Sequence, residues 1–523
     1  MKGRRKQSAA WWQAGAVYQI YPRSFQDADG DGVGDLRGII GRLDHLAWLG
    51  VDAVWLSPIF PSPMADFGYD VADYTSVDPL FGSLADLDEL IKEIHARGMR
   101  ALLDFVPNHT SDRHAWFLDA RSSRGAAHRD WYIWRDPAAG GGPPNGWPSA
   151  FRGSAWEWDE HTGQYYFHAF LREQPDLDWT NPAVRSAMHD VMRFWFARGV
   201  DGFRIDVLWL LAKGPELTAG RAPGQLDAPD YSTLQPQVHD IVRGLRAVAN
   251  EYDERVLIGE IYLPVEQLVS FYGADGSGIH LPFNFQLLLQ PWRAPDVHAA
   301  VVGYEELLPV GAWPNWVLGN HDNSRVASRV GAAQARVAAM LLLTLRGTPT
   351  LYYGDEIGMA DVNVPLAEQR DPQGLRGGVS RDPARTPMRW RAGPGAGFTK
   401  GAPWLPIGPA VGEISVAAQR DDPGSMLALH RRLLALRRAE PALSVGSWQD
   451  LGTAGSTLAY LRSDAERSFL VALNLAGAHS ALPPAASSLS GSVAVSTLAG
   501  GAGERYANRS RLAPDEGLVV QLD

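Results

Sequence analysis

The chain has 523 residues, a formal net charge of −11 at pH 7 and no cysteine. Its length implies more than one domain and a large core. The acidic balance argues against a nucleic-acid or anionic-membrane partner, and without cysteine neither disulfides nor Cys-ligated metals can form. The longest apolar run, residues 337–345, is too short to span a membrane and predicts a buried helix. The basic N-terminus lacks the apolar segment of a signal peptide, so we expect a cytoplasmic protein.

The first distinctive segment is the acidic loop at residues 27–35, where carboxylates alternate with glycines. Oxygen ligands at alternate positions can surround a hard cation, and Gly30 and Gly32 permit a sharp turn. The loop predicts a Ca²⁺ or Mg²⁺ site. A solvated acidic surface loop is the alternative interpretation.

Four later segments place polar residues at the end of a short apolar run. They are residues 104–109, 202–207, 259–262 and 319–322. Helical patterns precede the first segment or lie between segments, at 83–97, 183–198 and 237–250. Strands that alternate with helices and carry polar residues at their C-terminal ends predict a (β/α)8 TIM barrel with its active site on that face.

The segment at 202–207 predicts a buried strand with a charged pair on one side. Period-two alternation points Arg204 and Asp206 the same way. A guanidinium beside a carboxylate favours the ionised form, which suits a nucleophile. For these two residues alone, a structural ion pair is an equally good explanation.

Two long segments, at residues 110–177 and 355–404, interrupt the alternation of strands and helices. We therefore expect a barrel formed by residues 1–109 and 178–440, with a lid-like loop at 355–404 and an inserted subdomain at 110–177. The insert is rich in Gly, Pro and Trp, and a connection of that length is usually functional. Short strands and small-residue turns after position 440 predict an antiparallel β-sandwich at 441–523.

In this order, the four polar segments resemble the signature regions of the α-amylase family of retaining glycoside hydrolases. Residues 50–58 and 347–356 resemble its second and eighth barrel strands. Residues 18–25 and 385–388 are similar to the branch that holds α-glucosidase and oligo-1,6-glucosidase. The resemblance runs from about residue 11 to residue 404, and implies that the insert forms a wall of the substrate pocket.

The resemblance assigns the three acids. Retaining glycoside hydrolysis needs an ionised nucleophile and a protonated acid about 5–5.5 Å apart. Asp206 is the expected nucleophile and Glu260 the expected acid, in a setting beside Ile258 and Ile261 that is compatible with a raised pKa. Asp322 is expected to bind ring hydroxyls and distort the sugar.

The resemblance also implies a pocket for one terminal glucose. An ion pair between Asp66 and Arg381 would grip the terminal hydroxyls and block further units, while Tyr69 stacks on the ring. His109 and His321 would bond to hydroxyls. The expected substrate-binding residues are Asp66, Tyr69, His109, Phe151, Phe170, Arg204, His321 and Arg381. The expected ligands of a structural metal are Asp27, Asp29, Asp31, Asp35 and the carbonyl of Val33.

These features predict an exo-acting retaining α-glucosidase for short oligosaccharides, as a monomer or homodimer. Residues 208–213 and 281–285 resemble maltase-type bacterial α-glucosidases, so α-1,4 linkages are expected to be favoured over α-1,6. Within the family, Val at position 207 accompanies α-1,6 acceptance, which points the other way. A transglucosylase or glycosyl isomerase acting on maltose or sucrose is the alternative. A catalytically inactive binding or scaffolding relative is the third possibility, and the presence of all three acids argues against it.

Overall fold

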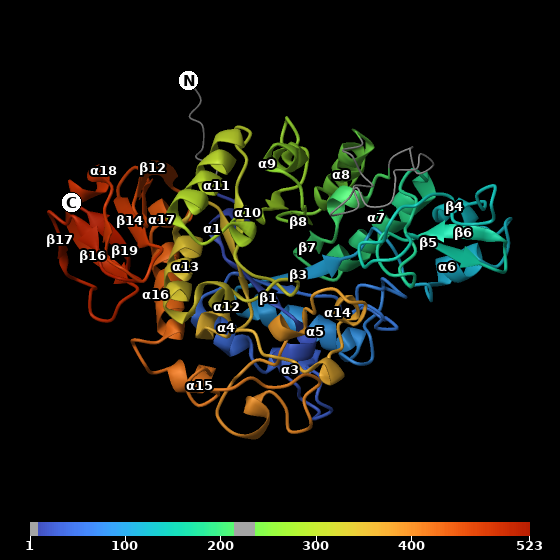
Figure 1. The fold of residues 1–523 in the computed structure, drawn as a ribbon, viewed down its shortest axis with the longest axis horizontal. Coiled ribbons are helices and arrows are strands. Elements are labelled where there is room, and N and C mark those ends of the chain that lie inside the picture. The colour runs from blue at the N-terminus through green and yellow to red at the C-terminus, as the bar shows by residue number, and fades with distance from the viewer. Residues whose placement is uncertain (1–8, 214–235) are drawn as a thin grey trace.

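The structure, a computed structural model that describes residues 9–213 and 236–523, is built around a barrel of eight parallel strands (Figure 1). The strands are β1 (Val17–Ile20), β2 (Ala53–Leu56), β3 (Arg100–Phe105), β7 (Gly202–Ile205), β8 (Val256–Glu260), β9 (Leu281–Phe283), β10 (Asn315–Val317) and β11 (Thr348–Tyr352). The sheet runs β10-β11-β1-β2-β3-β7-β8-β9. A parallel bridge between Asn284 and Trp316 joins its two ends. The predicted (β/α)8 barrel is confirmed.

The barrel strands are buried on both faces, as parallel strands covered by helices must be. In β2, Ala53 and Trp55 belong to the cluster inside the barrel, whereas Val54 and Leu56 belong to the larger core beneath the helices. Residues 1–8 and 214–235, which the predicted barrel ranges include, lie outside the described part of the chain.

The longer helices are α4 (Leu43–Leu49), α5 (Leu84–Ala96), α7 (Pro182–Ala197), α8 (Pro236–Ala249), α11 (Ala294–Leu307), α13 (Ala332–Thr344) and α16 (Met426–Ala439). Three of these seven, α5, α7 and α8, start and stop close to the predicted ranges 83–97, 183–198 and 237–250, and the apolar run at 337–345 lies mostly within α13. A capping box formed by Ser83 and Asp86 starts α5. Asn181 caps α7, and Pro182 occupies its first position. In the described residues no helix is long and apolar enough to cross a membrane.

Short helices connect these elements. They are α1 (Trp11–Ala14), α2 (Pro22–Phe25), α3 (Leu36–Ile40), α6 (Ala115–Ala120), α9 (Val265–Leu268), α10 (Gln286–Leu289), α12 (Val326–Val330), α14 (Pro372–Leu375), α15 (Val416–Gln419), α17 (Pro441–Ser444) and α18 (Pro484–Ser487).

A small antiparallel sheet is inserted between β3 and β7. Its strands β4 (Trp134–Arg135), β5 (Trp156–Asp159) and β6 (Gln164–Phe167) are ordered β4-β6-β5. Its apolar cluster contains Trp156 and Phe167, and also Val207 and Leu210, which follow β7. The insert is therefore packed directly against the carboxyl end of a barrel strand, where a wall of the site would have to stand.

The chain ends in an antiparallel domain on the other side of the barrel from the insert (Figure 1). Its main sheet has the order β12-β13-β14-β19-β16-β17. The bounds are β12 (Ser447–Ala454), β13 (Thr457–Ser463), β14 (Ser468–Asn474), β16 (Gly491–Ser496), β17 (Arg505–Tyr506) and β19 (Gly517–Leu522), with β15 (Ser480–Ala481) and β18 (Arg511–Leu512) in a separate pair. The predicted antiparallel C-terminal domain is confirmed, and it consists of one six-stranded sheet and a separate two-stranded sheet.

Candidate active site

The predicted catalytic residues line one cavity of about 220 Å³ at the carboxyl ends of the barrel strands. Asp206 follows β7, Glu260 ends β8, and Asp322 lies in the loop after β10. The predicted substrate-binding residues that also line it are Asp66, Tyr69, His109, Phe151, Phe170, His321 and Arg381. The insert supplies the two phenylalanines, and the segment after β11 supplies Arg381.

Arg204 lies behind this lining and connects three acids from three strands. Its Nη1 donates to Asp104 Oδ1 at 2.9 Å and to Asp206 Oδ1 at 2.7 Å. Its Nη2 lies 2.7 Å from Glu260 Oε2. Arg204 is 1% exposed, so its charge acts in a dry setting. It thereby holds the carboxyl groups of Asp206 and Glu260 close together.

The three acids that share the guanidinium of Arg204 do not have the ionisation expected of exposed carboxyl groups. Burial raises the pKa of Asp206 well above its ordinary value, because the attraction of Arg204 is offset by Glu260 and Asp104. Burial also raises the pKa of Glu260, and it raises the pKa of Asp104 to about 6. Arg204 lowers the pKa of Asp206 as expected, but burial outweighs this attraction. The Asp206–Glu260 pair therefore retains a proton over the range in which an exposed carboxyl group is ionised.

The backbone directly after Asp206 is strained. Val207 has a φ of 39°, in the left-handed region that β-branched residues rarely occupy. This conformation directs the Val207 N–H to Glu260 Oε2 at 2.9 Å and begins the short 3-10 helix Leu208–Leu210. Strain of this kind costs about 1–3 kcal/mol and concentrates at functional sites. Here it ties the residue after one acid to the second acid.

The predicted ion pair between Asp66 and Arg381 is present. Arg381 Nη2 lies 2.7 Å from Asp66 Oδ1, and the same guanidinium donates to Asp371 Oδ1 at 2.6 Å and to Asp322 Oδ1 at 3.1 Å. Arg385 Nη2 also donates to Asp322 Oδ1 at 3.0 Å. Although burial opposes it, contacts with His321 and the two arginines hold the pKa of Asp322 well below its usual range. Asp322 is thus the firmly ionised acid of the three.

Both pocket histidines are neutral. Burial lowers the pKa of His109 to about 4 and that of His321 to about 3. His109 Nε2 lies 3.0 Å from the carbonyl of Tyr69, and His321 Nε2 lies 3.3 Å from Asp322 Oδ2. The ring of Tyr69 stacks on that of His321, with centroids 5.3 Å apart. A neutral imidazole can donate or accept a hydrogen bond, as contact with sugar hydroxyls requires.

The cavity also contains residues to which sequence analysis assigned no role. They are Gln174, Trp209, Tyr262 and Gln373. Val207, which was considered only for linkage preference, lines the cavity as well. Gln174 Nε2 lies 3.1 Å from His109 Nε2, and Trp209 packs edge-on against Tyr262 with centroids 5.7 Å apart. Trp209 lies shortly after Asp206 in the sequence and Tyr262 shortly after Glu260. Their closeness to candidate acids could therefore have identified them as pocket residues. Gln373 lies on α14, where the sequence carries no comparable signal.

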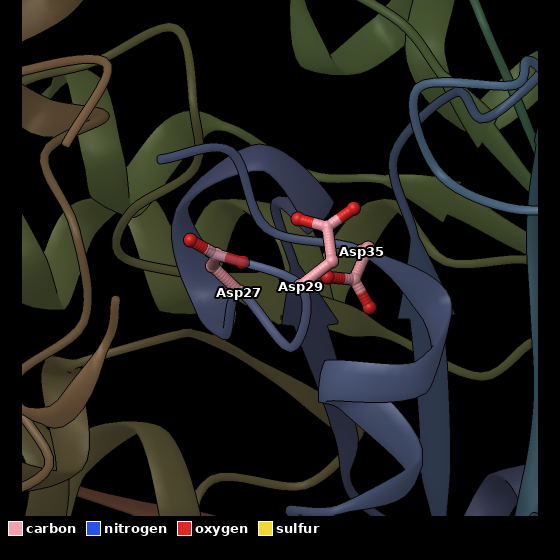
Figure 2. Close-up of side chains that lie close together, drawn as sticks. All are labelled: Asp27, Asp29 and Asp35. Atoms are coloured by element: carbon pink, nitrogen blue, oxygen red, sulfur yellow. The ribbon is translucent and has the colours of Figure 1, made fainter. Parts of the chain in front are cut away.

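The acidic loop before α3 brings three carboxylates together (Figure 2). Side-chain oxygens of Asp27, Asp29 and Asp35 lie within 4.8 Å of one another, close enough to hold an ion. Gly30 and Gly32 have φ values of +92° and +95°, which confirms that the turn needs glycine. A Cβ at Gly32 would lie 1.9 Å from the carbonyl oxygen of Ala402, so the loop also packs backbone against backbone on the segment after β11.

The donor set of this loop consists of carboxylate oxygens, which fits a hard divalent cation. Backbone N–H groups hold the carboxylates in place: Gly30 donates to Asp27 at 2.6 Å and Ala28 donates to Asp35 at 2.7 Å. Asp31 lies outside the cluster and accepts a hydrogen bond of 2.7 Å from the backbone of Val33. Its role and that of the Val33 carbonyl as ligands stay predictions.

The model of the α-amylase catalytic domain matches residues 19–446. The chain belongs to the α-amylase family. A probable α-glucosidase from Rhizobium meliloti (strain 1021) is 41% identical over 492 residues, covering 89% of this chain and 89% of the relative. An oligo-1,6-glucosidase from Parageobacillus thermoglucosidasius is 38% identical, covering 84% of this chain and 85% of the relative. This α-amylase family member is a glycoside hydrolase of the α-glucosidase type.

A solved structure extends the similarity over almost the whole of this α-amylase family chain. The crystal structure of the α-glucosyl transfer enzyme XgtA superimposes with a TM-score of 0.90 at 38% sequence identity. It covers 99% of this chain and 100% of its own. The similarity therefore includes the inserted sheet and the C-terminal domain as well as the barrel.

Proposed function

We propose that this protein is an exo-acting retaining α-glucosidase that removes terminal non-reducing glucose from short oligosaccharides, with α-1,4 linkages favoured over α-1,6. The observation that carries the proposal is the Asp66–Arg381 ion pair in the same cavity as Asp206, Glu260 and Asp322. The cavity of about 220 Å³ is smaller than the roughly 300–1,000 Å³ of pockets for larger ligands. It suits one sugar ring, with no room for a chain to pass through.

In the first step, a carboxylate oxygen of Asp206 attacks the anomeric carbon as the bond to the leaving oxygen breaks. Glu260 transfers its proton to that oxygen, which leaves as an alcohol. The proton held between Asp206 and Glu260 must then reside on Glu260, and Asp206 keeps the charge supported by Arg204. Asp206 and Glu260 both contact the guanidinium of Arg204, so their carboxyl groups lie close together, as retention rather than direct inversion requires.

In the second step, Glu260 takes a proton from water, and the resulting hydroxide oxygen displaces Asp206 from the anomeric carbon. Glucose is released with its configuration retained, and the acids return to their initial states. The ionised Asp322 and the neutral His109 and His321 would hold the sugar hydroxyls during both steps. Hydrogen bonds to a charged acceptor such as Asp322 are roughly twice as strong as neutral ones.

We also assign Ca²⁺, or Mg²⁺, to the loop of Asp27, Asp29 and Asp35 as a structural ion. None of these residues lines the substrate cavity. The ion would neutralise mutually repelling carboxylates and fix the loop that packs against Ala402. It supplies no group to the reaction.

The second candidate is transfer of glucose to a sugar hydroxyl, as a transglucosylase or glycosyl isomerase. The similarity to XgtA, which is named an α-glucosyl transfer enzyme, favours it. The first step is the same for both functions. They differ in whether water or another sugar receives the glucosyl group from Asp206, which the loops around the cavity decide.

The test is a product analysis with maltose, isomaltose and sucrose. We expect free glucose, released fastest from maltose, and a loss of at least about 10⁴-fold in kcat for Asp206→Asn. Asp190→Asn on α7 removes the same charge from an exposed position and should leave the rate unchanged. Trehalose, an isomerised sucrose or longer oligosaccharides as main products would favour the second candidate. Glucose release that survives in Asp206→Asn would contradict both.

A further inference from the structure

A second cavity, of about 680 Å³, lies between the acidic loop at residues 27–35, called the metal loop below, and the segment that follows β11. Four basic side chains line it: Arg42 before α4, Arg391 and Lys400 after β11, and Arg420 directly after α15. They come from three separate parts of the chain. On a protein with a formal net charge of −11, four cations around one cavity form a local reversal of charge.

These four cations have no acidic partner in the described part of the chain. In residues 9–213 and 236–523, none of the four forms an ion pair with a carboxylate. The two acids of the lining are engaged elsewhere. Asp44 binds Arg97 at 2.8 Å, and Asp27 accepts hydrogen bonds from the backbone of the metal loop and from the hydroxyl of Thr399.

Arg42 is held in place rather than free to move away. Its Nε donates to Gln26 Oε1 at 2.7 Å, its Nη2 donates to the carbonyl of Gly397 at 3.2 Å, and its guanidinium lies 4.2 Å from the ring centroid of Trp390. Its Nη1 has no partner in the described chain. Burial, and then the neighbouring charge of Arg391, lowers the pKa of Arg42. The cavity thus presents a hydrogen-bond donor with a fixed direction, Arg42 Nη1, and a second positive charge, Arg391, beside it.

We propose that this cavity binds a phosphate group, either as free phosphate or as the phosphomonoester of a small sugar. A dianionic phosphate presents several strong acceptor oxygens, and the Nη1 of the fixed Arg42 guanidinium can donate a charge-assisted hydrogen bond to one of them. An anion would also relieve the repulsion between Arg42 and Arg391. The volume of about 680 Å³ leaves space for a sugar beside the phosphate. The site shares no lining residue with the substrate cavity and does not depend on the proposed function.

The experiment is a calorimetric titration of the full-length, metal-loaded protein with inorganic phosphate and, separately, with glucose 6-phosphate. Free metal concentration and ionic strength are kept constant with chloride, and glucose serves as the uncharged control. The test variant is Arg391→Ala with Lys400→Ala, both exposed. The matched control is Lys92→Ala with Arg511→Ala, two exposed cations far along the chain from the cavity. Melting curves without ligand establish that both variants fold.

We expect saturable phosphate binding to the wild type and the control, and binding at least about tenfold weaker in the test variant. Maltose hydrolysis without phosphate should be the same in all three proteins. Glucose 6-phosphate binding tenfold more tightly than phosphate would identify a sugar phosphate as the ligand, and equal affinities would identify phosphate itself. The proposal is overturned if neither anion binds saturably, or if the test variant binds as tightly as the control.

Discussion

Lys213→Met should weaken the junction between the barrel and the inserted sheet. The side chain of Lys213 is 4% exposed, and its Nζ lies 2.8 Å from Asp176 Oδ2. The same ammonium donates to Asn108 Oδ1. Asp176 also accepts from Asn108 Nδ2 at 3.0 Å and from the backbone of Ala169 at 2.7 Å. The buried charge of Lys213 thus links Asp176 in the inserted subdomain to Asn108, which directly precedes His109 in the pocket.

The expected loss follows from leaving Asp176 buried without its counter-charge. Breaking a buried ion pair by removing one partner costs about 3–5 kcal/mol. An unfolding entropy of about 2.1 cal/mol/K per residue converts this loss into a fall in Tm of roughly 3–5 °C for a chain of this length that unfolds as one unit. Methionine fills the same volume, so a cavity contributes little.

The assay is differential scanning calorimetry at constant metal concentration, with Asp176→Asn added to Lys213→Met as the decisive second variant. The neutral amide leaves no buried charge, and the amide of Asn108 can turn to present its oxygen. The double variant should therefore recover at least half of the lost Tm. A single variant within about 1 °C of the wild type, or a double variant no more stable than the single one, would refute the reasoning.

Three further predictions concern the pocket and the loop. Arg381→Ala should lower kcat/KM on maltose by at least about 10²-fold by releasing the sugar-binding acids, whereas Arg376→Ala nearby should not; equal effects would count against the closed pocket. Because burial raises the pKa of Asp206 and Glu260, kcat/KM should rise with pH as the nucleophile ionises and fall at higher pH as the acid ionises, both above the ordinary carboxyl range. α-Glucosyl fluoride needs no proton donor, so the Glu260→Gln variant can be assayed on it and should show no fall of kcat/KM at high pH. If that fall persists in the variant, Glu260 is not the group that causes it. EDTA should lower Tm and leave kcat at 25 °C unchanged, with no effect of EDTA in Asp29→Ala; a wild-type Tm indifferent to EDTA and to added Ca²⁺ would remove the metal site.

Elements with strong local signals could be predicted from the sequence. The helix expected at 183–198 is Pro182–Ala197, because an Asn-Pro start and a continuous amphipathic pattern define it locally. By contrast, β9 (Leu281–Phe283) is three residues long and contains a proline. It is a strand because β8 pairs with it, which no window of sequence shows.

The chemistry of the site divides in the same way. Residue types and their order along the chain identify Asp206, Glu260 and Asp322 as candidates. The ionisation of Asp206 depends on how many acids share Arg204, and Asp104 reaches that guanidinium from 100 residues away. The φ of Val207 is likewise a consequence of packing and its bond to Glu260, since valine itself disfavours it. Spatial sharing of this kind leaves no trace in local sequence.

The ion pair between Asp66 and Arg381 has a consequence for synthesis on the ribosome. Asp66 and Arg381 are 315 positions apart, so at about 5–20 residues per second the aspartate waits roughly 15–60 seconds for its partner. During that interval the first barrel strands also lack β11, which pairs with β1. A nascent chain shorter than about 400 residues would therefore have neither a closed barrel nor the Asp66–Arg381 ion pair. Sugar cannot act as a folding template for this enzyme until nearly all of the catalytic domain has left the exit tunnel.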